Sequence, residues 1–138
     1  MFYGRYDHSL DDKNRLRIPA RLKKGLGDDG ACIGVSKNNK CLVIYPRYTI
    51  ESIGNKLRDQ LVPKEKQNAI RRFLASIYDI EEDAQGRFTL NNFLRESSGI
   101  TKDLVFVGMN DRIELWDSKT FDSMIDDEED IDLSEFGI

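Results

Sequence analysis

The chain contains the same pentapeptide pattern twice, and this internal repeat is the feature that most limits how it can fold. DDKNR at residues 11–15 and DAQGR at residues 83–87 each place an Asp four positions before an Arg. A shift of the sequence by 72 positions puts Asp11 on Asp83 and Arg15 on Arg87, and it also aligns Tyr6 with Tyr78, Leu22 with Leu94 and Gly27 with Gly99. Self-similarity of this kind predicts two copies of one structural unit.

The matches continue further along the chain with a small change of register. After Gly27 the shift becomes 71, which aligns Leu42, Ile44 and Tyr45 with Ile113, Leu115 and Trp116. We therefore divide the chain into an N-terminal unit at 1–61, a connecting amphipathic helix at 62–78, a C-terminal unit at 79–125 and an acidic, disordered tail at 126–138. Because halves of this size bury little surface alone, we expect them to share one core.

Each pentapeptide predicts a tight hairpin turn between two strands. Asp11 and Asp83 suit the first position of a type I turn. The fourth position is Asn14 in one copy and Gly86 in the other, the two residue types that best tolerate a positive φ. A type I turn followed by such a residue closes a short hairpin loop. This turn would fix where Arg15 and Arg87 emerge.

The remaining segments predict a second hairpin and short helices in each copy. ACIGVS turns through KNNK into CLVIY, and DLVFVG turns through MNDR into IELW. Between the hairpins, the sequence predicts a short helix at residues 19–27 and another at residues 91–99. Each ends at a glycine, and Pro19 suits a first helical position. Helical spacing also marks Ile50, Ile53, Leu57 and Leu61 after the first copy, and Ile70, Phe73, Leu74 and Ile77 in the connector. Since isolated hairpins are marginal, the fold class is α+β, mainly β: one pseudo-symmetric β-barrel with flanking helices.

Charge and composition exclude several classes of protein. The net charge of -4 hides eight acids and no base at 122–138, so the rest of the chain carries +4. There is no apolar run long enough to span a membrane and no signal-peptide pattern at the start, which predicts a cytoplasmic protein. Cys32, Cys41 and the single His8 are too few for a zinc site, so we expect no metal and no cofactor, and the cysteines should pack as small apolar residues.

The pentapeptides are the candidate functional site. An exposed loop with Lys13, Arg15 and Arg17 in one copy, and Gln85 with Arg87 in the other, offers positive charge for phosphates and groups that read base edges. A two-stranded ribbon also fits the major groove. The alternative is a plain ion pair between Asp and Arg, which contributes only about 0–1 kcal/mol when exposed.

A family resemblance rests on five segments and their spacing, in chain order YDHSLDD, DDKNRLRIPARL, VIYP, DAQGRFTLNNFLR and IELW. In these segments the chain resembles the MraZ family of bacterial transcriptional regulators. The resemblance covers residues 1 to about 122. It implies a swapped-hairpin barrel of AbrB type, a ring-shaped, octamer-like homo-oligomer, and nucleoid-associated binding to direct repeats in the promoter of the division and cell-wall operon. Asn14 departs from the family's usual Gly, and Asn91 from a frequent Pro. The expected DNA-binding residues are Lys13, Asn14, Arg15, Arg17, Gln85 and Arg87, with Asp11, Asp83 and Gly86 shaping the turns and orienting the arginines.

Two other functional classes, an enzyme and a protein-interaction module, make different demands on the sequence. An enzyme needs a nucleophile with its base or a carboxylate pair in a pocket, and the repeated acids have no partner His or Cys, so we expect no catalysis and no small-molecule substrate. An AbrB-type antitoxin or another protein-interaction module is the stronger alternative. For the acidic tail, competition with DNA for the basic surface and a simple solubility role both stay open.

Overall fold

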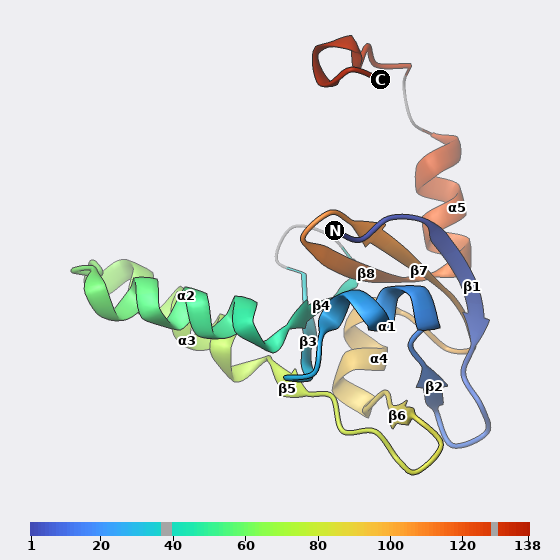
Figure 1. Cartoon of the computed structure of the whole chain (residues 1–138), viewed down its shortest axis with the longest axis horizontal. Coiled ribbons are helices and arrows are strands. Elements are labelled where there is room, and N and C mark those ends of the chain that lie inside the picture. Colours follow the sequence, from blue (N-terminus) through green and yellow to red (C-terminus); the bar gives the residue numbers. More distant parts are fainter. Residues whose placement is uncertain (37–39, 128–129) are drawn as a thin grey trace.

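A computed structural model describes residues 1–36, 40–127 and 130–138 (Figure 1). The first copy forms β1 (Arg5–Ser9), β2 (Arg15–Arg17), α1 (Ala20–Leu26), β3 (Ala31–Val35), β4 (Leu42–Pro46) and α2 (Arg47–Asp59). The helix α3 (Lys64–Ala75) leads to the second copy, which forms β5 (Tyr78–Asp79), β6 (Arg87–Thr89), α4 (Asn92–Ser98), β7 (Asp103–Met109), β8 (Arg112–Asp117) and α5 (Ser118–Asp126). The protein is therefore α+β.

Strands of one copy pair mainly with strands of the other. The larger sheet has the order β1-β7-β8-β4-β3-β5, and β2 and β6 form a separate two-stranded sheet. The described pairs β1–β7, β3–β5, β4–β8 and β2–β6 all join the two copies, and β3–β4 and β7–β8 are the hairpins within a copy. The predicted second hairpins are confirmed, although the turn at 37–39 lies outside the described residues.

Both central pairings are symmetric about equivalent residues. In β4–β8, Val43 lies opposite Glu114, which is the same position in the other copy. In β2–β6, Leu16 lies opposite Phe88, again the same position. A pseudo-twofold axis therefore relates the copies through both sheets.

The buried side chains form one main core to which both copies contribute. Its members include Leu22 and Leu94 from α1 and α4, together with Ile44 and Phe106 from the sheet. A smaller cluster contains Cys41, Val43, Val105 and Trp116. Both cysteines are free and buried, as predicted, and burial raises the pKa of the Cys41 thiol to about 12.

For the first hairpin of each copy, the predicted turn is present but the predicted pairing of the two flanking strands is wrong. The turn at 11–15 forms, but β1 then pairs with β7 while β2 pairs with β6. The turn chemistry specified the local reversal of the chain, and packing against the other copy chose different partners for the two strands. In the described residues the two sheets form no closed barrel, because the β2–β6 ribbon is not joined to either edge of the larger sheet.

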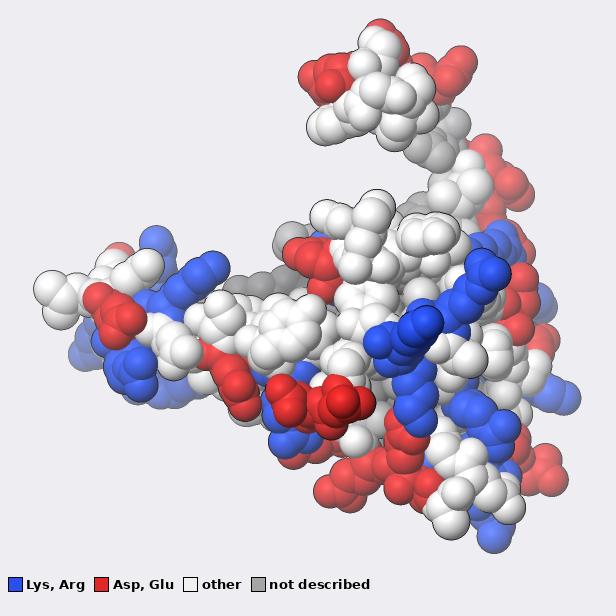
Figure 2. Space-filling view, in the orientation of Figure 1, with Lys and Arg blue, Asp and Glu red and all other residues white. Residues whose placement is uncertain are grey.

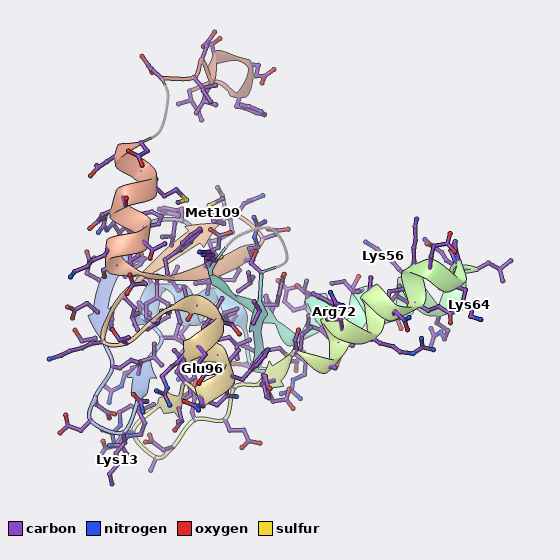
Figure 3. All side chains as sticks on the ribbon, turned by 180° about the vertical axis from the view of Figure 1, so that it is seen from behind. Lys13, Lys56, Lys64, Arg72, Glu96 and Met109 are labelled. Atoms are coloured by element: carbon purple, nitrogen blue, oxygen red, sulfur yellow. The ribbon has the colours of Figure 1, made fainter. Side chains whose placement is uncertain are left out.

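Helices α2 and α3 extend together as an arm away from the sheets (Figures 1 and 3). α3 lies within the segment 62–78 that was predicted as the connector and is shorter than it at both ends. α2 ends at Asp59, so Leu61 lies beyond it and is fully exposed. Neither helix contains a fully buried residue, although each has one apolar face.

The helix ends differ slightly from the prediction. Pro19 is the residue before α1 rather than its first residue, and at the equivalent position Asn91 caps α4 by accepting a hydrogen bond from the Leu94 N–H at 2.9 Å. In the tail, Ser134–Phe136 forms a short 3-10 turn, and every residue from 130 to 138 is exposed. Residues 128–129 lie outside the described part. In the part that is described, no helix is long and apolar enough to cross a membrane.

Candidate nucleic-acid interface

The loop at 11–15 is closed by its own Asp side chain. Asp11 Oδ1 accepts hydrogen bonds from the backbone N–H of Lys13 at 2.9 Å and of Arg15 at 2.8 Å. The Asn14 N–H donates to the Asp11 carbonyl at 3.0 Å, and Asn14 has a φ of 58°. The left-handed residue is therefore the one that turns the chain back toward Arg15.

The loop at 83–87 repeats this geometry. Asp83 Oδ1 accepts from the backbone N–H of Gln85 and of Arg87, both at 2.9 Å. Gly86 takes the left-handed position with a φ of 76°. In both loops, hydrogen bonds from backbone N–H groups to the carboxylate lower the pKa of the Asp, most strongly the bond from the Arg at the end of the loop.

The β2–β6 ribbon brings the two loops side by side at one end of the molecule. Arg15 Nε donates to Asp11 Oδ2 at 2.8 Å, and Arg87 Nε donates to Asp83 Oδ2 at 3.3 Å. The arginines also approach the opposite copy: Arg87 Nη1 lies 3.5 Å from Asp11 Oδ2, and Arg15 Nη1 lies 3.9 Å from Asp83 Oδ2. Two Asp and two Arg thus form one cluster, which we call the Asp-Arg network.

The arginines of this network are oriented rather than freely extended. The Arg15 and Arg87 side chains are 27% and 26% exposed. The Nε of each is held by the Asp of its own loop, while the Arg15 terminal nitrogens make no hydrogen bond with another described residue. The guanidinium ends therefore keep donors available at the surface.

The other predicted residues surround the network. Lys13 lies at the tip of the first loop and is exposed, as Figure 3 shows, and Gln85 is exposed at the matching place in the second loop. Arg17 lies opposite Arg87 in the ribbon and is also exposed. Asn14 and Gly86 are half-buried beneath the loop tips.

Acidic side chains outside the two pentapeptides share this end of the molecule, and the pentapeptide pattern does not predict them. Glu82 precedes the second loop and forms a salt bridge with Lys23 of α1. Figure 2 shows red and blue groups mixed along the lower edge, where the loops lie. The sequence carries no local signal for the Lys23–Glu82 contact, because the two residues are 59 positions apart. The contacts across the Asp-Arg network likewise depend on the register of the β2–β6 ribbon, which no local sequence pattern specifies.

The described residues contain no group of three or more His, Cys, Asp or Glu that could hold a metal. His8 lies on β1 and packs edge-on against Phe106, with ring centroids 5.3 Å apart.

Comparisons with known proteins agree on one family. The sequence model of the family described as "MraZ protein, putative antitoxin-like" matches residues 1–73 and again residues 73–135. A "Transcriptional regulator MraZ" from Natranaerobius thermophilus is 34% identical over 124 residues, which cover 89% of this chain and 85% of the relative. The protein of the same name from Acetivibrio thermocellus is 35% identical and covers 93% of this chain and 89% of the relative.

A third relative matches this chain over almost the full length of both proteins. The "Transcriptional regulator MraZ" from Lachnoclostridium phytofermentans is 34% identical, with 100% of this chain and 99% of the relative covered. The tandem family match repeats the internal duplication seen in the sequence and in the strand pairing. The chain belongs to the MraZ family.

Proposed function

We propose that the protein is a sequence-specific DNA-binding transcriptional regulator and that the loops at 11–15 and 83–87 together form its base-reading surface. The observation that carries this proposal is the meeting of both loops in one Asp-Arg network at the end of the β2–β6 ribbon. A two-stranded ribbon with projecting loops has the dimensions of the DNA major groove. Relatives named transcriptional regulators support the same function.

The network suits guanine recognition. Asp11 and Asp83 hold the Nε of Arg15 and Arg87. Both terminal nitrogens of Arg15 remain to donate to O6 and N7 of guanine, whereas Arg87 Nη1 also donates to Asp11 Oδ2 at 3.5 Å and keeps only part of its donors for a base. The aspartates shape the loops and orient the arginines and would not touch the anionic DNA. A fixed orientation also lowers the entropy lost on binding.

The remaining loop residues supply supporting contacts. Lys13 and Arg17 are exposed cations suited to phosphates, and Gln85 carries an amide that can reach a base edge. Asn14 and Gly86 bring the backbone close to the DNA at the two turns.

A few contacts per subunit bind weakly, so we propose that subunits assemble into a closed, octamer-like ring that matches direct repeats upstream of the division and cell-wall operon. Repetition of a weak site raises the effective concentration of each loop at the next half-site. The strand pairing between copies supports an interleaved, AbrB-type arrangement of hairpins as the rigid frame. This role would place the protein on the nucleoid in the cytoplasm, without catalysis.

The test is binding to labelled DNA from upstream of its own gene, measured by fluorescence anisotropy. Arg15→Ala and Arg87→Ala should each abolish specific binding and leave the circular dichroism melt almost unchanged. Lys119→Ala, which removes the same charge from an exposed side chain on α5, away from both the loops and the arm, is the matched control and should bind normally. Normal binding by Arg15→Ala, or loss of binding by all three variants alike, would remove the proposed site.

The antitoxin-like description of the matched family favours a second candidate, a regulator that works together with a protein partner. The two functions differ in what the purified chain does alone. Retardation of the upstream DNA by the pure protein supports the autonomous regulator. Retardation that appears only after cell extract is added supports the second candidate.

A further inference from the structure

The arm formed by α2 and α3 carries an apolar groove with a basic margin. One group of side chains lines this groove from both helices: Ile53, Leu57, Lys66, Ala69, Ile70 and Phe73. The four larger apolar members are only half-buried, so the single chain leaves this surface in contact with water. An apolar groove rimmed by charge is typical of an interaction site.

The arm also carries an excess of positive charge. Residues 47–75 contain seven Lys or Arg and three Asp or Glu, a net charge of +4. Figure 2 shows basic groups toward the outer end of the arm, with acidic groups among them, and Figure 3 labels Lys56, Lys64 and Arg72 on its two helices. A partner for this surface should therefore combine apolar side chains with negative charge.

The C-terminal tail has this combination. Residues 126–138, DDEEDIDLSEFGI, hold seven acids and no base. Four apolar side chains are interspersed among the acids, and all four are exposed: Ile131 at 65%, Leu133 at 42%, Phe136 at 70% and Ile138 at 83%. A solubility tail or a mimic of DNA needs the acids but has no use for these apolar groups. Their presence points to a groove that is both apolar and basic.

We propose that the tail at 130–138 of one subunit docks into the α2–α3 groove of a second copy of the chain. Phe136 and its apolar neighbours would cover Ile70 and Phe73, and the acids would pair with Lys66 and the other cations of the arm.

The occupant is assigned to a second copy because the two segments lie apart in the single chain. In Figures 1 and 3 the tail continues beyond α5, while the arm extends from the other side of the sheets. The contact would link neighbouring subunits by a segment outside the sheets. It does not depend on DNA binding, so its test contains no DNA.

Disulfide trapping between two co-expressed, differently tagged full-length chains tests the proposal. One chain carries Ala69→Cys in the groove and the other carries Ser134→Cys in the tail. Mild oxidation should give a mixed disulfide severalfold more abundant than with Asn68→Cys, which helical spacing places on the opposite face of α3. The wild-type chain, whose two cysteines are buried, sets the background.

Two substitutions separate docking from chance collision. Phe136→Ser and Lys66→Glu should each reduce the mixed product severalfold, and Asp132→Lys on the tail chain should restore the yield lost through Lys66→Glu. A chain that carries both cysteines and closes on itself, with no mixed product, would show that the tail occupies its own arm and would overturn the proposal. Equal yields from Ala69→Cys and Asn68→Cys would also overturn it.

Discussion

At the residue scale, the fourth position of each pentapeptide shows how backbone conformation restricts the side chain. Asn14 and Gly86 have φ values of 58° and 76°, a region in which only Gly is unstrained and Asn is tolerated. A Cβ at Gly86 would meet other atoms no closer than 3.6 Å, so conformation and not crowding governs this position.

Gly86→Ala should therefore destabilise the protein by about 1–2 kcal/mol, the cost of a left-handed conformation for a residue with a Cβ. Asn14→Gly should change stability by only a few tenths of a kcal/mol, because the lost Asn strain offsets the added chain entropy. Urea unfolding midpoints measure both changes. An unchanged midpoint for Gly86→Ala would contradict the positive φ at this turn.

The lowered pKa values of Asp11 and Asp83 predict how acid acts on the protein. Their folded pKa values lie below those of the unfolded chain, mainly because backbone N–H groups donate to the carboxylates. The stabilisation is thus fully present above about pH 4 and is lost as the pH falls through the folded pKa values. The double variant Asp11→Asn/Asp83→Asn should be less stable than the wild type at pH 6.

As the pH falls through the lowered pKa values of Asp11 and Asp83, the two proteins should converge, because the wild-type carboxyls become protonated. Urea midpoints recorded from pH 6 to pH 2 give the comparison. A constant difference between wild type and variant over this range would show that the carboxylate charge does not act through these hydrogen bonds.

At the element scale, the N-termini of the two short helices α1 and α4 are stabilised in different ways. Pro19 and Asn91 are equivalent positions of the repeat, and both immediately precede a helix. The ring of Pro19 restricts the backbone already in the unfolded chain, whereas the Asn91 side chain accepts a hydrogen bond from the Leu94 N–H. The Asn91 φ of -66° is one that proline adopts without strain.

Asn91→Ala should cost about 1 kcal/mol, the usual effect of losing an N-cap side chain. Asn91→Pro should fall between Asn91→Ala and the wild type, because the ring reduces the freedom of the unfolded chain while the cap is still lost. Thermal unfolding followed by circular dichroism ranks the three proteins. A proline variant less stable than the alanine variant would show that the two copies do not share this backbone geometry.

Some of the helices, strands and strand pairings can be predicted from the sequence alone, and others cannot. The helices and the second hairpins follow from spacing and turn residues that are local in sequence. The pairing partners of β1 and β2 do not follow from local sequence. The turn residues Asp11 and Asn14 reverse the chain direction, but they do not specify which strands pair with β1 and β2. For the same reason the Asp11–Arg15 bond could be foreseen, while the approach of Arg15 to Asp83 required the ribbon register.

At the scale of the whole molecule, interleaved strands make each copy dependent on the other. The centre of the larger sheet pairs Val43 with Glu114, whose side chain is nearly buried and accepts a hydrogen bond from Trp116 Nε1 at 3.1 Å. A self-paired first copy would set Val43 against Val43. A self-paired second copy would set two buried carboxylates against each other, which is strongly unfavourable.

We therefore expect the fragment 1–62 to fold as a homodimer and the fragment 63–138 to remain unfolded alone at pH 7. Both should fold together when mixed, and Glu114→Val should allow the second fragment to pair with itself. Size-exclusion mass measurement with circular dichroism follows each case. A folded monomer of either fragment would contradict the interleaved architecture.

The central claim is that Arg15 and Arg87 read bases through oriented guanidinium groups. Its most direct test is the ratio of affinities for the upstream duplex and a scrambled duplex, measured at one salt concentration for the wild type and for Arg15→Lys/Arg87→Lys. Lysine keeps the charge but cannot form two parallel hydrogen bonds to guanine, so binding to scrambled DNA should persist while the ratio falls close to one. A ratio equal to that of the wild type would contradict base reading by these two residues.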